Sequence, residues 1–225
     1  MKERIKTDSA ILSSVIILTA FVFGFYKWYP SSPLVDNLLN FLGMLTLLKG
    51  TYIRMGARGY KKKYSGKGTE LVMDGPYSFV RNPMYLGTLL MGSGFILILW
   101  PWWSLPIFVG LFYLRFNRQM VKEEAHLGKS FGKDYQAYMK RTPRLFPDLG
   151  KLRKMKLNQV FPWELAWTTK EKYALFIWPG VAIVLELMQQ RFFGARADVS
   201  ETISIFALAV ITFSFCLWWE YSRAA

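Results

Sequence analysis

Arg81, Asn82 and Pro83 mark a place where the sequence could bind a small anionic group. Asn caps free backbone N–H groups and Pro suits the first helical position, so the pattern predicts a helix that begins here, after a turn at Gly75-Pro76. A helix N-terminus presents unpaired N–H donors and partial positive charge, which Arg81 reinforces. It could hold the carboxylate or phosphate of a ligand. On these residues alone, a well-capped membrane helix with a positive flank is the simpler interpretation.

A second group of polar residues follows an apolar run that ends near Met120. Arg118 and Gln119 stand at the end of this run, and Glu123 and Glu124 come about one helical turn later. Polar side chains at that depth usually face protein or a water-filled cavity rather than lipid. The two carboxylates are either an ordinary solvated pair or a site for an ammonium group or ribose hydroxyls. The residues themselves leave both interpretations open.

The composition predicts a membrane protein. The chain has 225 residues, of which 52% are apolar, with nine Trp and several apolar runs long enough to span a bilayer. The net charge is +14, and the Lys and Arg residues stand mainly beside the apolar runs, as the positive-inside rule expects. We therefore predict that the basic residues contact membrane lipids, and we expect no nucleic acid as a partner. One histidine, His126, and one cysteine, Cys216, are too few for a histidine or cysteine metal site, and we expect no metal.

We therefore predict an all-α polytopic integral membrane protein, with about six transmembrane helices and cytoplasmic helical extensions. Residues 1–225 would form a single membrane domain, with a core at 54–147 and an additional C-terminal helix pair at 171–222. Basic loops alternate with neutral ones, which places both termini and the loop before Asn82 in the cytoplasm. The spans are expected at about residues 10–28, 34–53, 83–100, 105–120, 173–188 and 202–219.

Small residues and aromatic spacing predict two details of packing. Gly87, Gly92, Ser93 and Gly94 would let the third and fourth helices approach each other closely. Aromatic residues within 131–138 recur at spacings of three and four, which indicates an amphipathic helix that returns along the membrane face. No pattern predicts the oligomeric state.

Two blocks of the sequence together resemble the signature of the integral-membrane methyltransferases. This group includes isoprenylcysteine carboxyl methyltransferase and the phospholipid methyltransferases. The resemblance covers residues 69–147, roughly a third of the chain. Two spaced blocks in the right order are far more specific than either alone. The blocks are Gly75-Pro76-Tyr77 with Arg81-Asn82-Pro83-Met84-Tyr85, and Glu123-Glu124 with Phe131-Gly132, Tyr135, Tyr138 and Arg144-Leu145-Phe146-Pro147.

The resemblance implies S-adenosylmethionine as cofactor, bound at the cytoplasmic face, and a lipid-like or prenylated acceptor that enters from the bilayer. Arg118 and Gln119 would lie on the acceptor side, since the isoprenylcysteine enzymes have Arg where this chain has Gln119. The family also commonly has His where this chain has Asn82. By the same similarity Glu123 would bind the cofactor from the fourth helix. The remaining implied cofactor contacts are Leu71, Val72, Tyr77, Asn82, Pro83, Met84 and Tyr85.

Methyl transfer mainly requires alignment of the two reactants. A sulfonium methyl group is already an activated electrophile, so neither a metal nor a covalent intermediate is needed. A carboxylate acceptor needs no base. An amine acceptor must lose a proton, and Glu124, His126 and Tyr85 are the nearby candidates. Two alternatives remain, a membrane NAD(P)H-dependent reductase of the sterol-reductase type and a non-catalytic membrane scaffold.

Overall fold

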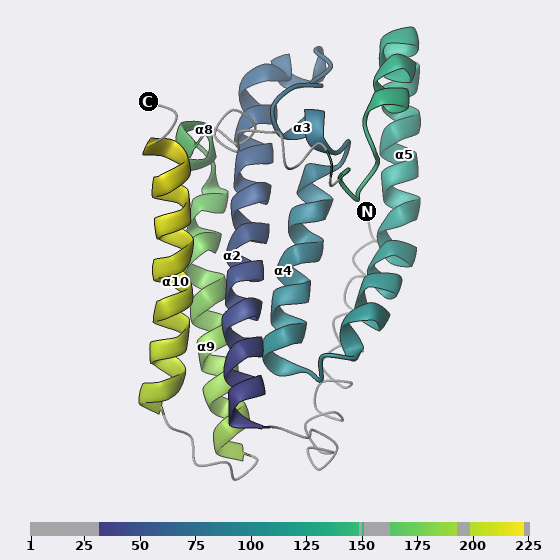
Figure 1. Ribbon diagram of the computed structural model, residues 1–225. Coiled ribbons are helices and arrows are strands. Elements are labelled where there is room, and N and C mark those ends of the chain that lie inside the picture. The colour runs from purple at the N-terminus through teal and green to yellow at the C-terminus, as the bar shows by residue number, and fades with distance from the viewer. Residues whose placement is uncertain (1–31, 149, 151–162, 193–198, 223–225) are drawn as a thin grey trace.

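The computed structural model describes residues 32–148, 150, 163–192 and 199–222, and every regular element in these ranges is a helix. The all-α prediction is confirmed for this part of the chain. The predicted first span, at residues 10–28, lies outside the described residues. Figure 1 shows the long helices side by side, with α2 between α4 on one side and the α9–α10 pair on the other. In chain order the elements are α2 (Pro33–Tyr64), η2 (Gly66–Gly68), α3 (Pro76–Phe79), α4 (Pro83–Leu99), α5 (Ser104–Arg141), α8 (Trp163–Trp167), η3 (Lys170–Tyr173), α9 (Ala174–Phe192) and α10 (Val199–Ser222).

The closest helix packing joins α2 to the antiparallel α4 through glycines. A Cβ atom added at Gly50 would lie 2.6 Å from the carbonyl oxygen of Gly87, and one added at Gly94 would lie 2.6 Å from that of Gly43. The glycines are seven residues apart on both helices, so two turns of backbone meet without side chains between them. Our prediction that Gly87 and Gly94 pack against the fourth span is therefore wrong. Gly92 does face that helix, because a Cβ there would collide with the ring of Phe108.

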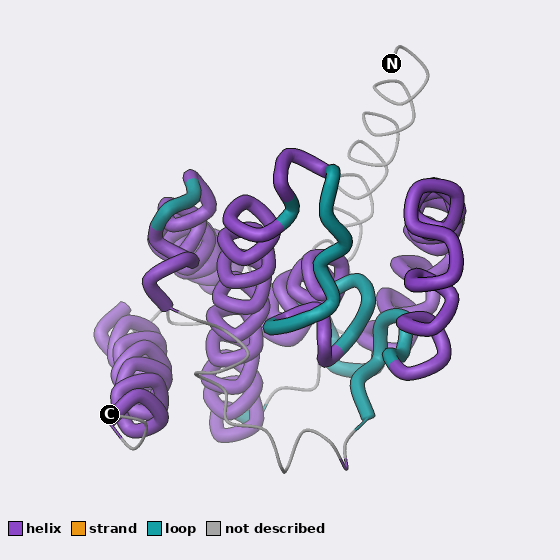
Figure 2. Tube along the Cα trace, turned by 90° about the horizontal axis from the view of Figure 1, so that it is seen from above, coloured by secondary structure: helices purple, strands orange, loops and turns teal. Residues whose placement is uncertain are grey.

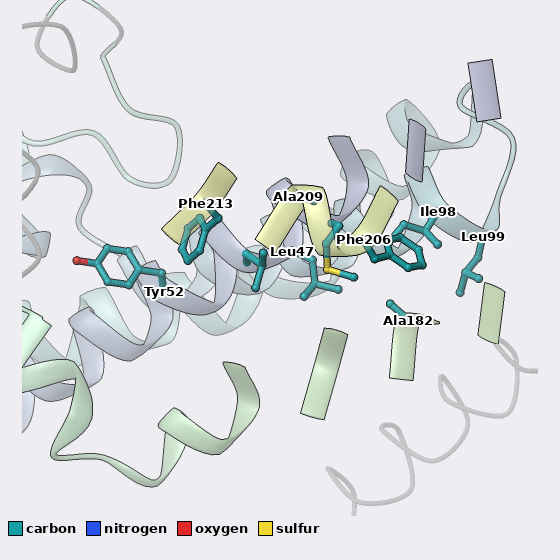
Figure 3. Close-up of a cluster of buried hydrophobic side chains, with 10 residues drawn as sticks. Leu47, Tyr52, Ile98, Leu99, Ala182, Phe206, Ala209 and Phe213 are labelled. Atoms are coloured by element: carbon teal, nitrogen blue, oxygen red, sulfur yellow. The ribbon is translucent and has the colours of Figure 1, made fainter. Parts of the chain in front are cut away.

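An apolar core fills the space between α2, α4, α9 and α10. Figure 3 shows Leu47 and Tyr52 of α2 close to Phe206, Ala209 and Phe213 of α10. Ile98 and Leu99 of α4 and Ala182 of α9 complete the labelled cluster. Van der Waals packing of these apolar side chains attaches the C-terminal helix pair to α2, because helices in a bilayer gain little from the removal of apolar surface from water.

Helix α5 changes direction at Gly132. The backbone of Gly132 has a φ angle of 50°, in the left-handed region that favours glycine, and the helix continues beyond it to Arg141. The returning segment carries Tyr135 and Tyr138, whose side chains are both buried. This agrees with the predicted returning helix, although the two aromatic residues face protein.

Among the residues that the structure describes, two helical segments are long and apolar enough to cross a membrane, Lys170–Arg191 and Val199–Ser222. Helix α4 is apolar but has 17 residues, one turn short of a typical span. The six predicted spans are thus not confirmed by helix length and hydropathy in the described residues. Helix α2 carries polar side chains at Asp36, Asn37, Asn40 and Lys49, which lower its mean hydropathy.

Candidate active site

The candidate site begins at the turn that Gly75 makes before α3. Gly75 has a φ angle of 57°, and its Cα faces the ring of Tyr60, so a side chain there would meet both backbone strain and a collision. The Ser78 hydroxyl donates to the Gly75 carbonyl oxygen at 2.7 Å, which fixes the short helix α3. The turn brings Tyr77 under α2, where its hydroxyl donates to the Ala57 carbonyl oxygen at 3.4 Å. Figure 2 shows the loops of this region gathered at one end of the bundle.

Asn82 is the N-cap residue of α4, as predicted, but its side chain does not cap the helix. The amide Nδ2 instead donates to Glu124 Oε1 of α5 and to the carbonyl oxygen of Arg144, both at 3.3 Å. The backbone N–H groups of Arg81 and Asn82 donate to the carbonyl oxygens of Pro143 and Arg144 at 2.8 and 3.1 Å. The loop before α4 is therefore fastened to the segment that follows α5, and the two sequence blocks meet here.

Glu124 is the centre of the polar network that joins these segments. Its side chain is 8% exposed and accepts two hydrogen bonds from Arg144, Nε to Oε1 at 3.1 Å and Nη2 to Oε2 at 2.7 Å. Arg81 Nη1 lies 3.3 Å from the same Oε1. Arg144 Nη1 also donates to Asn117 Oδ1 at 3.0 Å, so α5 contributes a second partner about two turns earlier. A buried carboxylate with two guanidinium groups and an amide is well compensated for its loss of water.

Glu123, the neighbouring residue, is exposed. Its Oε1 accepts a hydrogen bond from the Tyr85 hydroxyl of α4 at 2.8 Å and another from Gln119 Nε2 at 3.0 Å. These contacts bring three predicted site residues together. Asn82, which the resemblance also assigns to the cofactor, contacts Glu124, whereas Tyr85 contacts Glu123.

Two tyrosines, the half-buried Tyr77 and the buried Tyr138, support the network with neutral phenol groups. Burial raises the pKa of Tyr77, and the nearby Glu123 raises it further while Arg58 lowers it. Burial also raises the pKa of Tyr138, whose hydroxyl donates to the Tyr77 carbonyl oxygen at 2.6 Å. Both phenols therefore remain protonated donors at neutral pH, and Tyr77 lies within electrostatic reach of Glu123 and Arg58.

The other predicted residues lie around this centre. Pro83 is buried and Met84 half-buried in the first turn of α4, and Leu71 and Val72 are half-buried in the loop that precedes α3. Arg118 is exposed on α5, close in sequence to Gln119.

Sequence reasoning missed the role of Arg81 and Arg144 as partners of Glu124. The sequence contained the signal for this role. Arg81 and Arg144 stand in the same two sequence blocks as Asn82 and the Glu123-Glu124 pair, and a buried carboxylate requires positively charged partners. It also missed Glu171 in η3, whose carboxylate binds Arg54 at 3.2 Å and Arg58 at 2.6 Å and so connects the C-terminal region to α2.

One buried donor at the site has no partner. Arg81 Nε is enclosed and makes no hydrogen bond, although the same side chain binds Glu124 and Tyr135. An unpaired buried donor beside the N-terminus of α4 fits an acceptor group such as a carboxylate. The exposed carboxylate of Glu123, the residue before Glu124 on α5, fits a cationic or hydroxyl donor.

Residues 37–134 match the profile of the phospholipid methyltransferase family. A protein-S-isoprenylcysteine O-methyltransferase of Schizosaccharomyces pombe is 26% identical over 133 residues, which cover 58% of this chain and 53% of that protein. The resemblance to the integral-membrane methyltransferases is confirmed. The matched family and the two long apolar helices together indicate a membrane protein.

Other relatives carry different names. The steroid 5-alpha-reductase DET2 of Solanum lycopersicum is 27% identical over 147 residues, which cover 60% of this chain and 56% of the reductase. The cobalt-zinc-cadmium resistance protein CzcN of Cupriavidus metallidurans is 30% identical over 138 residues, 61% of each chain. This chain thus spans between 53% and 62% of the length of the curated relatives that it matches. No solved structure gave a significant match.

Proposed function

We propose that this protein is an S-adenosylmethionine-dependent methyltransferase that acts at the cytoplasmic membrane face on a lipid-like or prenylated acceptor. The observation that carries the proposal is the convergence of Tyr85 and Gln119 on Glu123, beside the N-terminus of α4. Both donors contact Oε1 of Glu123, so Oε2 is the oxygen that we assign to the ligand. The match of residues 37–134 to a methyltransferase family supports the same reaction class.

In this proposal the two ends of the cofactor's amino-acid group meet opposite charges. The N-terminus of α4 and Arg81 Nε would receive the carboxylate, and Glu123 would receive the ammonium group or a ribose hydroxyl. Leu71, Val72 and Tyr77 would contact the cofactor from the loop side, with Asn82, Pro83, Met84 and Tyr85 at its amino-acid end. When bound, the cofactor supplies an activated sulfonium methyl group.

The protein would contribute alignment, exclusion of water and, for an amine acceptor, a proton acceptor. We assign Glu124 to positioning, because two guanidinium groups and the Asn82 amide already contact its carboxylate. Arg118 and Gln119 would face the acceptor. Arg118 is exposed, so it can reach an anionic headgroup that approaches along α5.

Calorimetry of the purified protein tests the proposal. S-adenosylmethionine should bind with measurable heat, its affinity should fall on the order of tenfold or more in Glu123→Gln, and NADPH should not bind. Binding of NADPH and none of S-adenosylmethionine would instead support a membrane reductase, the alternative that the 27% identity to a steroid 5-alpha-reductase favours. Binding of neither ligand would support a non-catalytic scaffold.

A further inference from the structure

Helix α9 buries a carboxyl group at the opposite end of the bundle from the candidate site. Glu186 is 6% exposed, and the helices around it are α2, which begins at this end, and α10. Glu186 itself lies in the C-terminal helix pair, beyond residues 37–134 that match the methyltransferase family. The proposed function gives it no role.

The hydrogen bonds to Glu186 reach only one of its two oxygens. Asn40 Nδ2 of α2 donates to Oε1 at 3.1 Å, and Gln190 Nε2 of α9 donates to the same Oε1 at 3.0 Å. The Gln190 amide also exchanges hydrogen bonds with the Thr202 hydroxyl of α10 at 3.1 and 3.2 Å. A polar cluster of amides and one hydroxyl therefore connects the carboxyl group to both neighbouring helices.

The second carboxyl oxygen has no partner. Glu186 Oε2 and Gln189 Oε1 are both buried without a hydrogen bond, and Gln189 stands three residues later, on the same face of α9. Both atoms are acceptors in an ionised glutamate and an amide, so neither can satisfy the other. A buried ionised carboxylate with one bare oxygen would be costly.

The charged groups around the cluster do not compensate a negative charge. Asp36 of α2 and Glu201 of α10, which accepts a hydrogen bond from Asn37, are both acidic. Helix α4, which also packs on α9, contains no charged residue. On α9 itself the nearest basic residue, Arg191, is exposed. A neighbouring carboxylate, here Asp36, favours the neutral form of a second carboxyl group.

We propose that Glu186 is a proton-binding site that holds the carboxyl group neutral, with the proton on Oε2. The protonated Oε2 becomes a donor, and we assign Gln189 Oε1, an unpaired acceptor three residues later on the same face of α9, as its partner. One proton thus gives a partner to both unpaired atoms and leaves Oε1 free to accept from Asn40 and Gln190. The site fastens α9 and α10 to α2 without placing a charge between the helices.

Infrared spectroscopy of the full-length protein in lipid bilayers tests the protonation state. At neutral pH the wild-type protein should show the carbonyl band of a protonated carboxyl group, and Glu186→Gln should lose it. Glu201→Gln, which changes an exposed carboxylate at the same end of the bundle, should keep the band. A spectrum in which Glu186→Gln removes no such band at neutral pH would overturn the proposal.

The pH dependence of thermal unfolding gives an independent readout. The folded protein would hold a proton that an unfolded glutamate releases near pH 4 to 5, so the melting temperature of the wild type should fall as the pH rises from about 5 to about 9. Glu186→Gln mimics the neutral carboxyl group, with one acceptor and one donor, and should fold and remove this slope. Glu186→Leu should melt lower at every pH, because Asn40 and Gln190 lose their acceptor. The same measurement at increasing sodium chloride separates a bound cation from a bound proton. If sodium chloride raises the melting temperature of the wild type and leaves that of Glu186→Gln unchanged, an ionised Glu186 binds a cation and our proposal is wrong.

Discussion

Glu124 and Arg144 form a two-point ion pair, with Arg144 Nε 3.1 Å from Oε1 and Nη2 2.7 Å from Oε2. The residues stand 20 positions apart, on α5 and on the segment that follows its returning part. Because Asn82 and Arg81 contact the same carboxylate, the pair fixes the loop before α4 and the segment after α5 in one arrangement. The hydrogen bond to Glu124 also raises the pKa of the Arg144 guanidinium, which stays charged.

Replacement of Arg144 should therefore destabilise the protein. Arg144→Ala leaves Glu124 buried with a single guanidinium partner, and loss of one member of a buried pair costs about 3 to 5 kcal/mol. Because the Arg144 side chain is 32% exposed, we expect a loss at or below the lower end of this range. Thermal unfolding measures the loss. Lys140→Ala, which removes an exposed positive charge four residues earlier, is the control and should change the melting temperature little. Equal melting temperatures for Arg144→Ala and the wild type would mean that the network contributes no stability.

The adjacent glutamates show what sequence reasoning could and could not predict. The helix start at Asn82-Pro83 and the polar positions on α5 follow from local patterns of caps and apolar residues. Consecutive helical residues point about 100° apart, so Glu123 and Glu124 face different directions, but the sequence does not say which of them is buried. The buried residue is Glu124, because Arg81 and Arg144 pair with it. Both arginines lie in loops, and the fold as a whole determines where these loops meet α5.

The glycines of α4 illustrate the same limit. Their spacing predicted close helix packing, which the structure contains, but the apolar patterns of the neighbouring helices do not say which one is the partner. Gly87 and Gly94 lie on the face toward α2, and Gly92 lies on the face toward α5. A pattern of small residues therefore predicts that a helix packs closely, but it does not predict which helix is its partner.

Replacement of Gly50 should disrupt the contact between α2 and α4. In Gly50→Ala the new methyl group would lie 2.6 Å from both the Gly87 carbonyl oxygen and the Met91 nitrogen, and backbone atoms cannot move aside cheaply. We expect a loss of about 1 to 3 kcal/mol, measured as a lower melting temperature. Gly110→Ala is the control, because nothing lies within 4 Å of its added Cβ, and higher helix propensity should leave stability unchanged or raised. A Gly50→Ala protein as stable as Gly110→Ala would show that the helices pack less closely than described.

The proposed orientation predicts which loops face the cytoplasm. Ser65, after α2, and Ser32, before it, lie at opposite ends of the same helix. On a Cys216→Ser background, Ser65→Cys should react with an impermeant thiol reagent from the cytoplasmic side, and Ser32→Cys from the outside. Labelling of Ser65→Cys from outside would place the candidate site on the opposite face of the membrane.

Arg118 should affect the acceptor and not the cofactor. If the acceptor has an anionic headgroup, Arg118→Ala should raise the acceptor KM while the affinity for S-adenosylmethionine stays nearly constant, since one of the two substrates loses a contact. Initial rates and calorimetry measure the two effects separately. Lys122→Ala removes an exposed charge one turn later on α5 and serves as the control. Equal weakening of both substrates would indicate that Arg118 acts on the fold or on the cofactor.

Glu123 provides the sharpest test of the proposed cofactor site, because it contributes little to the fold. It is exposed and accepts hydrogen bonds from Tyr85 and Gln119, whereas Glu124 carries the buried ion pairs. Glu123→Gln keeps the size of the side chain and removes its charge. A charge-assisted hydrogen bond contributes roughly 1.5 to 3 kcal/mol, so S-adenosylmethionine should bind on the order of tenfold more weakly or worse. The melting temperature without ligand should stay the same, and calorimetry with His126→Gln, an exposed residue on the same helix, should match the wild type. Unchanged affinity in Glu123→Gln would remove Glu123 from the cofactor site and leave it as a solvated partner of Tyr85 and Gln119.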